Sequence, residues 1–216
     1  DWMCDRLEWD DTYQPDRGKV LSAEDLQEIE TFYRYMDVDG DGITYRTLPG
    51  VDPKGAYFTR GSGHDRFGRY TEDGDLYQEV MDRLAEKVES AADALPEPEI
   101  IQTPGATVGI VTIGGCRGAV LEAIEVLADE SILVDFLRVR GFPFAKSVEE
   151  FLLAHEVNIV VEQNRDAQLR RLLILETDVE KKAVVSILDY KGNPLSAEVV
   201  LDGVRERLGL VPTVVE

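Results

Sequence analysis

The sequence predicts an α/β fold, in which a parallel sheet with flanking helices is preceded by an irregular, partly helical arm. In the second half of the chain, β-branched apolar runs alternate with amphipathic stretches, the pattern of strands joined by helices. The first half is rich in glycine and poor in periodicity, and a proline-rich segment separates the halves. The chain has 216 residues, 44% of them hydrophobic, which suffices for one medium domain with a core beside such an arm.

The first half, residues 1–100, contains two predicted helices. A capping-box pattern at Ser22–Asp25 opens the first helix, and its apolar residues fall near one face. These residues are Leu26, Ile29, Tyr33 and Met36. The second helix is expected over 75–95, and its apolar residues recur at heptad-like spacing: Leu76, Val80, Leu84, Val88 and Leu95.

A long stretch without periodicity, residues 37–74, separates these helices. A loop of that length inside a compact protein is usually functional or packed against other protein. We therefore interpret residues 1–100 as a connecting arm that belongs to a larger assembly. The segment Leu95–Pro104 that follows has three prolines and is expected to be a semi-rigid linker.

The second half, residues 105–216, predicts four strands and four helices that alternate. Parallel strands with helical crossovers form a sheet that is covered on both faces. The helix expected over residues 147–155 should be capped by Ser147, with Glu150 three residues further on. The strands are expected over residues 106–113, 131–139, 157–162 and 183–188. The helices are expected over residues 119–128, 147–155, 166–175 and 196–208.

Composition excludes several classes of function. The 43 acidic and 23 basic residues give a net charge of −20, which argues against binding of nucleic acid or of an anionic membrane surface. No apolar run is long enough for a transmembrane helix. Two cysteines, Cys4 and Cys116, are too few for a disulfide framework or a zinc site, and a reducing cytoplasm is the expected location.

Residues 37–48 resemble a calcium-binding loop. Carboxylates stand at Asp37, Asp39 and Asp41, and Gly42 sits where the sharp turn would fall. Position 12 is Leu48, however, where a bidentate glutamate is required. A polar turn is therefore favoured and no metal ligand is predicted, although a non-catalytic interaction module that binds calcium here stays an alternative.

The turn Gly114–Gly118 follows a strand and opens a helix, as a dinucleotide-binding turn does. Cys116 takes the place of the second required glycine, and Asp135 could act as the ribose-binding acid. A tight turn without ligand is favoured, with a stand-alone nucleotide-binding α/β domain as an alternative. Cys116 is interpreted as a small buried residue rather than a nucleophile.

Two other polar segments are candidate binding sites. Residues 162–168 follow the third strand, at the sheet edge where ligands bind in open α/β folds, although they could equally cap the next helix. Between Tyr57 and Tyr70 lies a glycine-rich cluster in which Arg60, His64 and Asp65 offer a cation, an imidazole and a carboxylate. These three residues could bind an anionic small molecule or act as an acid–base pair, or the loop could simply pack on a neighbouring domain.

An ordered set of motifs resembles the alpha subunit of 2-oxoacid:ferredoxin oxidoreductases, and the 2-oxoglutarate type in particular. The motifs extend along nearly the whole chain, and their order makes the set specific. One departure is Ala167, since relatives often have glycine before Gln168. The motifs are residues 1–6, 15–21, 41–50, 57–64, 70–73, 160–164 and 168–169.

The resemblance covers the C-terminal third of such a subunit. It implies that residues 1–100 are the connecting arm after a pyrimidine-binding domain, and that residues 105–216 form an α/β domain like the transketolase C-terminal domain. The implied reaction is oxidative decarboxylation of 2-oxoglutarate or a related 2-oxoacid to an acyl-CoA, with electrons passed to ferredoxin.

The resemblance also implies where the chemistry lies. The whole complex would use thiamine diphosphate, magnesium, an iron–sulfur cluster and coenzyme A, with none of them held by this segment alone. The partners would be ferredoxin and a beta subunit that carries the pyrophosphate site and the cluster. The segment itself would serve assembly, with no catalytic residue and no activity in isolation, while Arg60, His64 and Asp65 would approach the substrate pocket.

Overall fold

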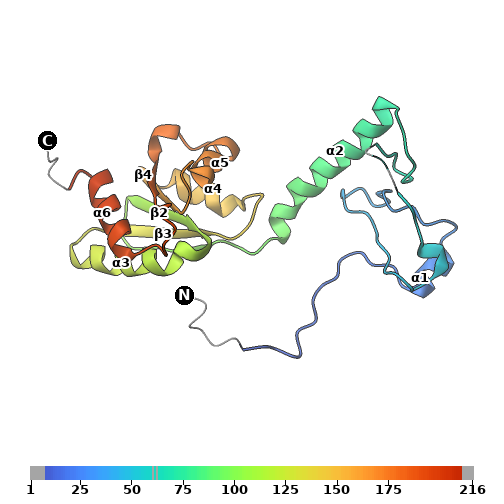
Figure 1. Ribbon diagram of the computed structural model, residues 1–216, viewed down its shortest axis with the longest axis horizontal. Helices are drawn as coiled ribbons and strands as arrows, with labels where there is room; N and C mark the ends of the chain where they lie inside the picture. The colour runs from blue at the N-terminus through green and yellow to red at the C-terminus, as the bar shows by residue number, and fades with distance from the viewer. Residues whose placement is uncertain (1–7, 60, 62, 211–216) are drawn as a thin grey trace. The chain divides into compact units, whose positions relative to one another are not determined.

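The structure is a computed structural model that describes residues 8–59, 61 and 63–210. The chain divides into two compact units, of which one ends at Ala94 and the other begins at Leu95 (Figure 1). We call them the arm unit and the sheet unit. In the described part of the chain, no helix is both long and apolar enough to span a bilayer.

The sheet unit is built on five strands in the order β1-β3-β2-β4-β5. Strands β2 to β5 pair in parallel, whereas β1 pairs antiparallel with β3. The α/β class is therefore confirmed, and all four predicted strands are present. The strands are β1 (Glu99–Ile101), β2 (Val108–Ile113), β3 (Val134–Val139), β4 (Val157–Glu162) and β5 (Val184–Leu188).

Strand β1 corrects the prediction of a linker over residues 95–104. Glu99–Ile101 lies in register with Phe136–Arg138 at the edge of the sheet. Glu99 also accepts hydrogen bonds from Arg117 Nε (2.8 Å) and Nη2 (2.6 Å). The ion pair with Arg117 and the backbone pairing with β3 stabilise this three-residue strand between prolines. Both interactions depend on residues far away in the sequence.

Helices cover both faces of the sheet, as predicted (Figure 1). One core cluster joins α3 and α6 to side chains such as Ile110, Phe136 and Ile159. The other joins α4 and α5 to side chains such as Val111 and Val160. The helices are α3 (Arg117–Asp129), α4 (Lys146–Leu153), α5 (Gln168–Glu176) and α6 (Ala197–Arg207).

The predicted cap of α4 is wrong. The N-cap residue is Ala145, which makes no side-chain capping bond. Ser147 lies inside the helix, and its hydroxyl donates to Glu97 instead (3.3 Å). The chain therefore enters this helix two residues earlier than the capping pattern indicated.

The arm unit contains α1 (Ala23–Glu28), α2 (Gly74–Ser90) and two short 3₁₀ turns, Pro53–Gly55 and Ala91–Ala94. The capping box at Ser22 and Asp25 is confirmed. The helix ends at Glu28, however, so the predicted face through Tyr33 and Met36 does not form. Ile29 is already extended, and the last turn contains Glu28 but no basic residue, so the charge at this end opposes the helix dipole.

Little of the arm unit is buried. Among its described residues, the buried apolar side chains are Leu26, Phe32 and Val80. On α2, Leu76 and Val88 of the predicted heptad face are 39% and 51% exposed. An apolar helix face that stays this open within its unit is typical of a surface that other protein covers.

Candidate functional site

The predicted substrate residues His64 and Asp65 lie in a tight turn of the arm unit, while Arg60 lies outside the described residues. His64 forms an antiparallel bridge with Tyr70, and the Asp65 N–H donates to the Arg69 carbonyl (2.9 Å). Glycine is required at Gly68, where φ is +80°. The glycine-rich cluster is therefore an ordered turn in its described part.

Asp65 holds this turn together. Its Oδ1 accepts the N–H groups of Phe67 and Arg69, both at 2.9 Å. No hydrogen bond joins Asp65 to His64 among the described residues, so the pair does not form an acid–base dyad in this structure. The carboxylate is instead part of the scaffold that positions its neighbours.

His64 is half-buried against an aromatic ring. Its imidazole stacks on Tyr35, with ring centroids 5.3 Å apart and planes 23° from parallel. Its Nε2 is buried and has no hydrogen-bond partner within the described residues. A ring nitrogen in this position can accept or donate one further hydrogen bond.

Tyr35 also borders a hollow of about 350 Å³ against α2. Arg83 donates from Nη1 to the Gly42 carbonyl (2.9 Å), and burial lowers the pKa of its guanidinium. Acidic side chains outnumber the two arginines, so this hollow does not favour an anionic ligand. The charged lining residues are Asp37, Arg66, Glu79, Asp82, Arg83 and Glu86.

The second candidate region is the carboxyl edge of the sheet, where the strand order reverses between β2 and β4. Open α/β sheets bind ligands at such a switch point. Here Glu162 is buried, and its Oε2 accepts the Leu169 N–H (2.8 Å) and the Asn164 amide (2.6 Å). Its Oε1 accepts the Arg170 N–H (3.2 Å). The polar segment therefore caps α5, the second of the two readings that the sequence left open.

Ala167 precedes α5 in the left-handed region, with φ 51° and ψ 52°. Only glycine adopts this conformation without steric cost from Cβ. Alanine therefore stands at a strained position, which the glycine expected from the family resemblance would occupy without strain.

Asp135 does not suit a ribose-binding role. It is the second residue of β3 and lies opposite Gly109, near the amino end of β2, whereas the Gly114 turn follows the carboxyl end. Its carboxylate accepts the Thr103 N–H (2.6 Å) and pairs with His155 Nε2 (3.0 Å). His155 contacts the Phe151 carbonyl through Nδ1 (2.7 Å), a buried pair that the sequence pattern did not reveal.

Cys116 is 3% exposed, and burial raises the pKa of its thiol. A raised thiol pKa lowers the thiolate fraction at neutral pH, so the residue is a poor nucleophile. This agrees with the interpretation of Cys116 as a small buried residue beside the Gly114 turn.

The calcium-like loop already holds a cation. Oxygen atoms of Asp37, Asp39 and Asp41 lie within 4.8 Å of one another. Lys19 Nζ lies 2.7 Å from both Asp39 Oδ1 and Asp41 Oδ1, and it also donates to the Ile43 carbonyl (3.1 Å). Although desolvation opposes the charge, these two carboxylates raise the pKa of Lys19 above its usual value. The ammonium thus takes the place that a metal ion would need.

Comparisons with known proteins bear on the whole chain. No protein-family model matches it. It is 33% identical over 197 residues to 2-oxoacid:ferredoxin oxidoreductase 2, subunit alpha, of Aeropyrum pernix, a match that covers 89% of this chain and 29% of that protein. The alpha subunit from Saccharolobus solfataricus is 28% identical over 195 residues, which cover 88% of this chain and 29% of that protein. The chain therefore spans less than a third of the length of these relatives.

A solved structure gives the same result. The 2-oxoglutarate:ferredoxin oxidoreductase from Magnetococcus marinus, with 2-oxoglutarate, coenzyme A and succinyl-CoA bound, superposes with a TM-score of 0.72 at 25% identity. The match covers 82% of this chain and 31% of that one. Neither unit alone makes up so much of the chain, so the match extends over both. The resemblance predicted from the motifs is confirmed.

Proposed function

We propose that this chain is part of the alpha subunit of a 2-oxoacid:ferredoxin oxidoreductase, because it matches one stretch of such subunits along most of its length. The complete enzyme converts a 2-oxoacid, 2-oxoglutarate or a relative of it, to an acyl-CoA and passes electrons to ferredoxin. The observation that carries the proposal is the alignment of both units at once, in sequence and in backbone shape.

In this proposal the sheet unit serves assembly rather than chemistry. The polar groups at its switch point are engaged: Glu162 and Asn164 bind the first turn of α5, and Cys116 is buried. Asp135 and His155 bind each other away from that edge. A side chain whose hydrogen bonds are already satisfied gains little by contacting a ligand.

The arm unit lines the substrate pocket through its glycine-rich turn. Asp65 fixes the turn, and His64 presents a buried nitrogen without a partner in the described part of the chain. Arg60 precedes this turn by four residues, and its guanidinium suits a bidentate contact to a substrate carboxylate. We assign His64 and Arg60 to substrate binding and Asp65 to the positioning of His64 through the turn that it holds.

The residues of this segment do not suit the metal cofactors of such an enzyme. An iron–sulfur cluster takes about four thiolates, and the chain has two cysteines. The acidic cluster of residues 37–41 is filled by the ammonium of Lys19. The cluster and magnesium are therefore assigned to the remainder of the complex, including a beta subunit, and the proposal places thiamine diphosphate and coenzyme A there as well.

The test is reconstitution. The complete alpha subunit from the parent reading frame, produced with its beta subunit, is expected to reduce ferredoxin when 2-oxoglutarate and coenzyme A are both present. The 216-residue chain alone is expected to be inert. The proposal would be overturned if the complete complex failed to reduce ferredoxin with every 2-oxoacid that is tested. Turnover by the isolated chain would also overturn it.

A further inference from the structure

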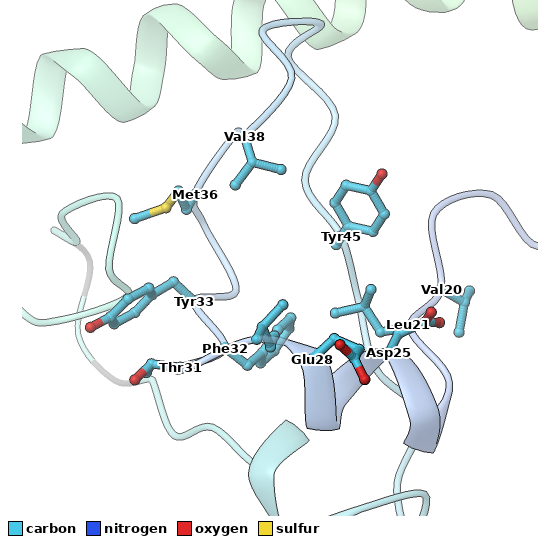
Figure 2. A pocket seen from close by; sticks show the side chains of 11 residues that line it. Val20, Leu21, Asp25, Glu28, Thr31, Phe32, Tyr33, Met36, Val38 and Tyr45 are labelled. Carbon is cyan, nitrogen blue, oxygen red and sulfur yellow. The ribbon is translucent and has the colours of Figure 1, made fainter.

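We propose that an apolar hollow beside α1 seats an apolar side chain of the alpha subunit from outside this chain, flanked there by a basic residue. The hollow, which we call the α1 hollow, has a volume of about 460 Å³ and opens between α1 and the segment that returns through Tyr45 (Figure 2). Its apolar lining includes Leu21, Ile29, Phe32, Met36, Val38 and Tyr45. The inference rests on the proposed function.

The hollow exists because α1 is short. If α1 continued past Glu28, its next turns would contain Ile29, Phe32 and Met36. Because the helix ends at Glu28, these residues instead line an open space. Phe32 is 8% exposed, whereas Val38 is 65% exposed. In Figure 2 the side chains of Met36 and Val38 lie across the hollow from α1. An apolar occupant would remove such surface from water, which favours its binding.

The rim of the hollow is acidic. Asp25 is engaged by the backbone and hydroxyl of Ser22, but the side chain of Glu28 is exposed and makes no hydrogen bond to any residue that the structure describes. Residues 1–100 as a whole have 25 acidic and 11 basic side chains. Complementarity therefore favours an occupant with a lysine or arginine next to its apolar side chain.

The alpha subunit itself is the best candidate for this occupant. The relatives are more than three times as long as the matched stretch, so most of the subunit lies outside it. The arm unit exposes thirteen large apolar side chains and buries three among its described residues, which is too small a core for a unit that stands alone. The excess of exposed apolar surface indicates intramolecular contacts within the longer subunit.

Hydrogen exchange tests the inference without mutation. Backbone amides of residues 32–45 are expected to exchange at least about tenfold more slowly in the complete alpha–beta complex than in the 216-residue chain. Strand β2 serves as the internal control, because its amides are paired in the sheet in both samples. Equal exchange of residues 32–45 in an active complex would overturn the docking proposal while leaving the proposed function intact.

Variants sharpen the test. Val38→Asp places a carboxylate in the hollow. In the complete complex it is expected to speed the exchange of the protected amides about tenfold, which removes the protection. Val51→Asp is the matched control, an exposed arm valine outside the hollow, and Glu28→Lys can be compared with Glu24→Lys on the same helix. Equal effects of a variant and its control would contradict the proposal.

Two further outcomes are decisive. If the chain alone sediments as a dimer that Val38→Asp dissociates, the occupant is a second copy and the proposal is overturned. If the complex shows the protection but oxidises no 2-oxoacid, the docking surface stands and the proposed function fails.

Discussion

Ala167 shows how one residue can oppose the fold that surrounds it. The hydrogen bonds of Glu162 and Asn164 fix the start of α5, and the preceding residue must then turn through the left-handed region. Alanine there has a Cβ that crowds the following carbonyl, whereas glycine does not. The backbone conformation of Ala167 is thus determined by the start of α5 rather than by the alanine side chain.

Ala167→Gly is expected to raise the free energy of unfolding by about 0.5–1 kcal/mol, because the relief of strain exceeds the entropy that glycine adds to the unfolded chain. Urea denaturation measures the change. Ala128→Gly, at an exposed helical position in α3, is the control and should lower stability by about 0.5–1 kcal/mol. Destabilisation by both variants would mean that Ala167 is not strained.

His64 carries the prediction for activity. In the complete complex, His64→Gln is expected to lower kcat/KM for 2-oxoglutarate by about tenfold, since the amide places its polar atoms differently from the imidazole. The melting temperature should change little, because Asp65 still holds the turn. Glu89→Gln on the exposed side of α2 is the control. An unchanged kcat/KM would remove His64 from the substrate pocket.

At the scale of elements, β1 depends on one carboxylate. Hydrogen bonds from Arg117 hold the pKa of Glu99 below its ordinary value near 4.5, and Arg138 and Arg140 act in the same direction. A lowered pKa means that the unfolded chain binds the proton more readily. The contribution of Glu99 to stability is therefore fully present above pH 4.5 and is lost as the pH falls through the lower, folded value.

Glu99→Gln is expected to lower the free energy of unfolding by about 1 kcal/mol at pH 7, and the difference from wild type should shrink as the pH falls below 4.5. Urea denaturation between pH 7 and about pH 3 measures it. Glu125→Gln, on the exposed surface of α3, is the control. A difference that stays constant down to the lowest pH would exclude Glu99 as its source.

The loop of residues 37–43 carries a prediction about calcium. Because the ammonium of Lys19 already lies between Asp39 and Asp41, and Leu48 has no side-chain carboxylate, wild-type protein is expected to show no saturable heat with millimolar calcium. Calorimetry of the chain at neutral pH decides this, with magnesium as a parallel titration. Stoichiometric calcium binding would restore the interaction-module alternative.

At the scale of the whole molecule, the two units differ in how much core supports them. Of the buried apolar side chains in the described residues, three belong to the arm unit and 23 to the sheet unit. Segments with few buried contacts open more often than well-packed ones. Separate stabilities are therefore expected for the two units of the isolated chain.

Limited trypsin digestion of the isolated chain is expected to cleave the arm unit first and to leave a resistant fragment that begins near Leu95. Mass spectrometry of the fragments over time identifies the first sites. If other parts of the subunit cover the arm, as proposed, the same arm sites should be cleaved at least about tenfold more slowly in the complete alpha–beta complex. Preferential cleavage inside the sheet unit would contradict this order of stability.

The sequence by itself determined those features that depend on neighbours along the chain. The four parallel strands follow from β-branched runs such as Val108–Ile113, and the capping box of α1 follows from residues three apart. The resemblance to a known family follows from an ordered set of motifs along the chain. These signals are short-range, so they can be read without knowing how distant segments meet.

Tertiary structure decided what depends on distant partners. Strand β1 forms because Glu99 meets Arg117 and the edge of β3, and Lys19 occupies an acidic loop some twenty residues away. Asp135 and His155 meet across a strand and a helix end, which gives Asp135 a structural rather than a ligand-binding role. Such contacts are fixed by register and packing in three dimensions, and the spacing of residues in the chain carries no information about them.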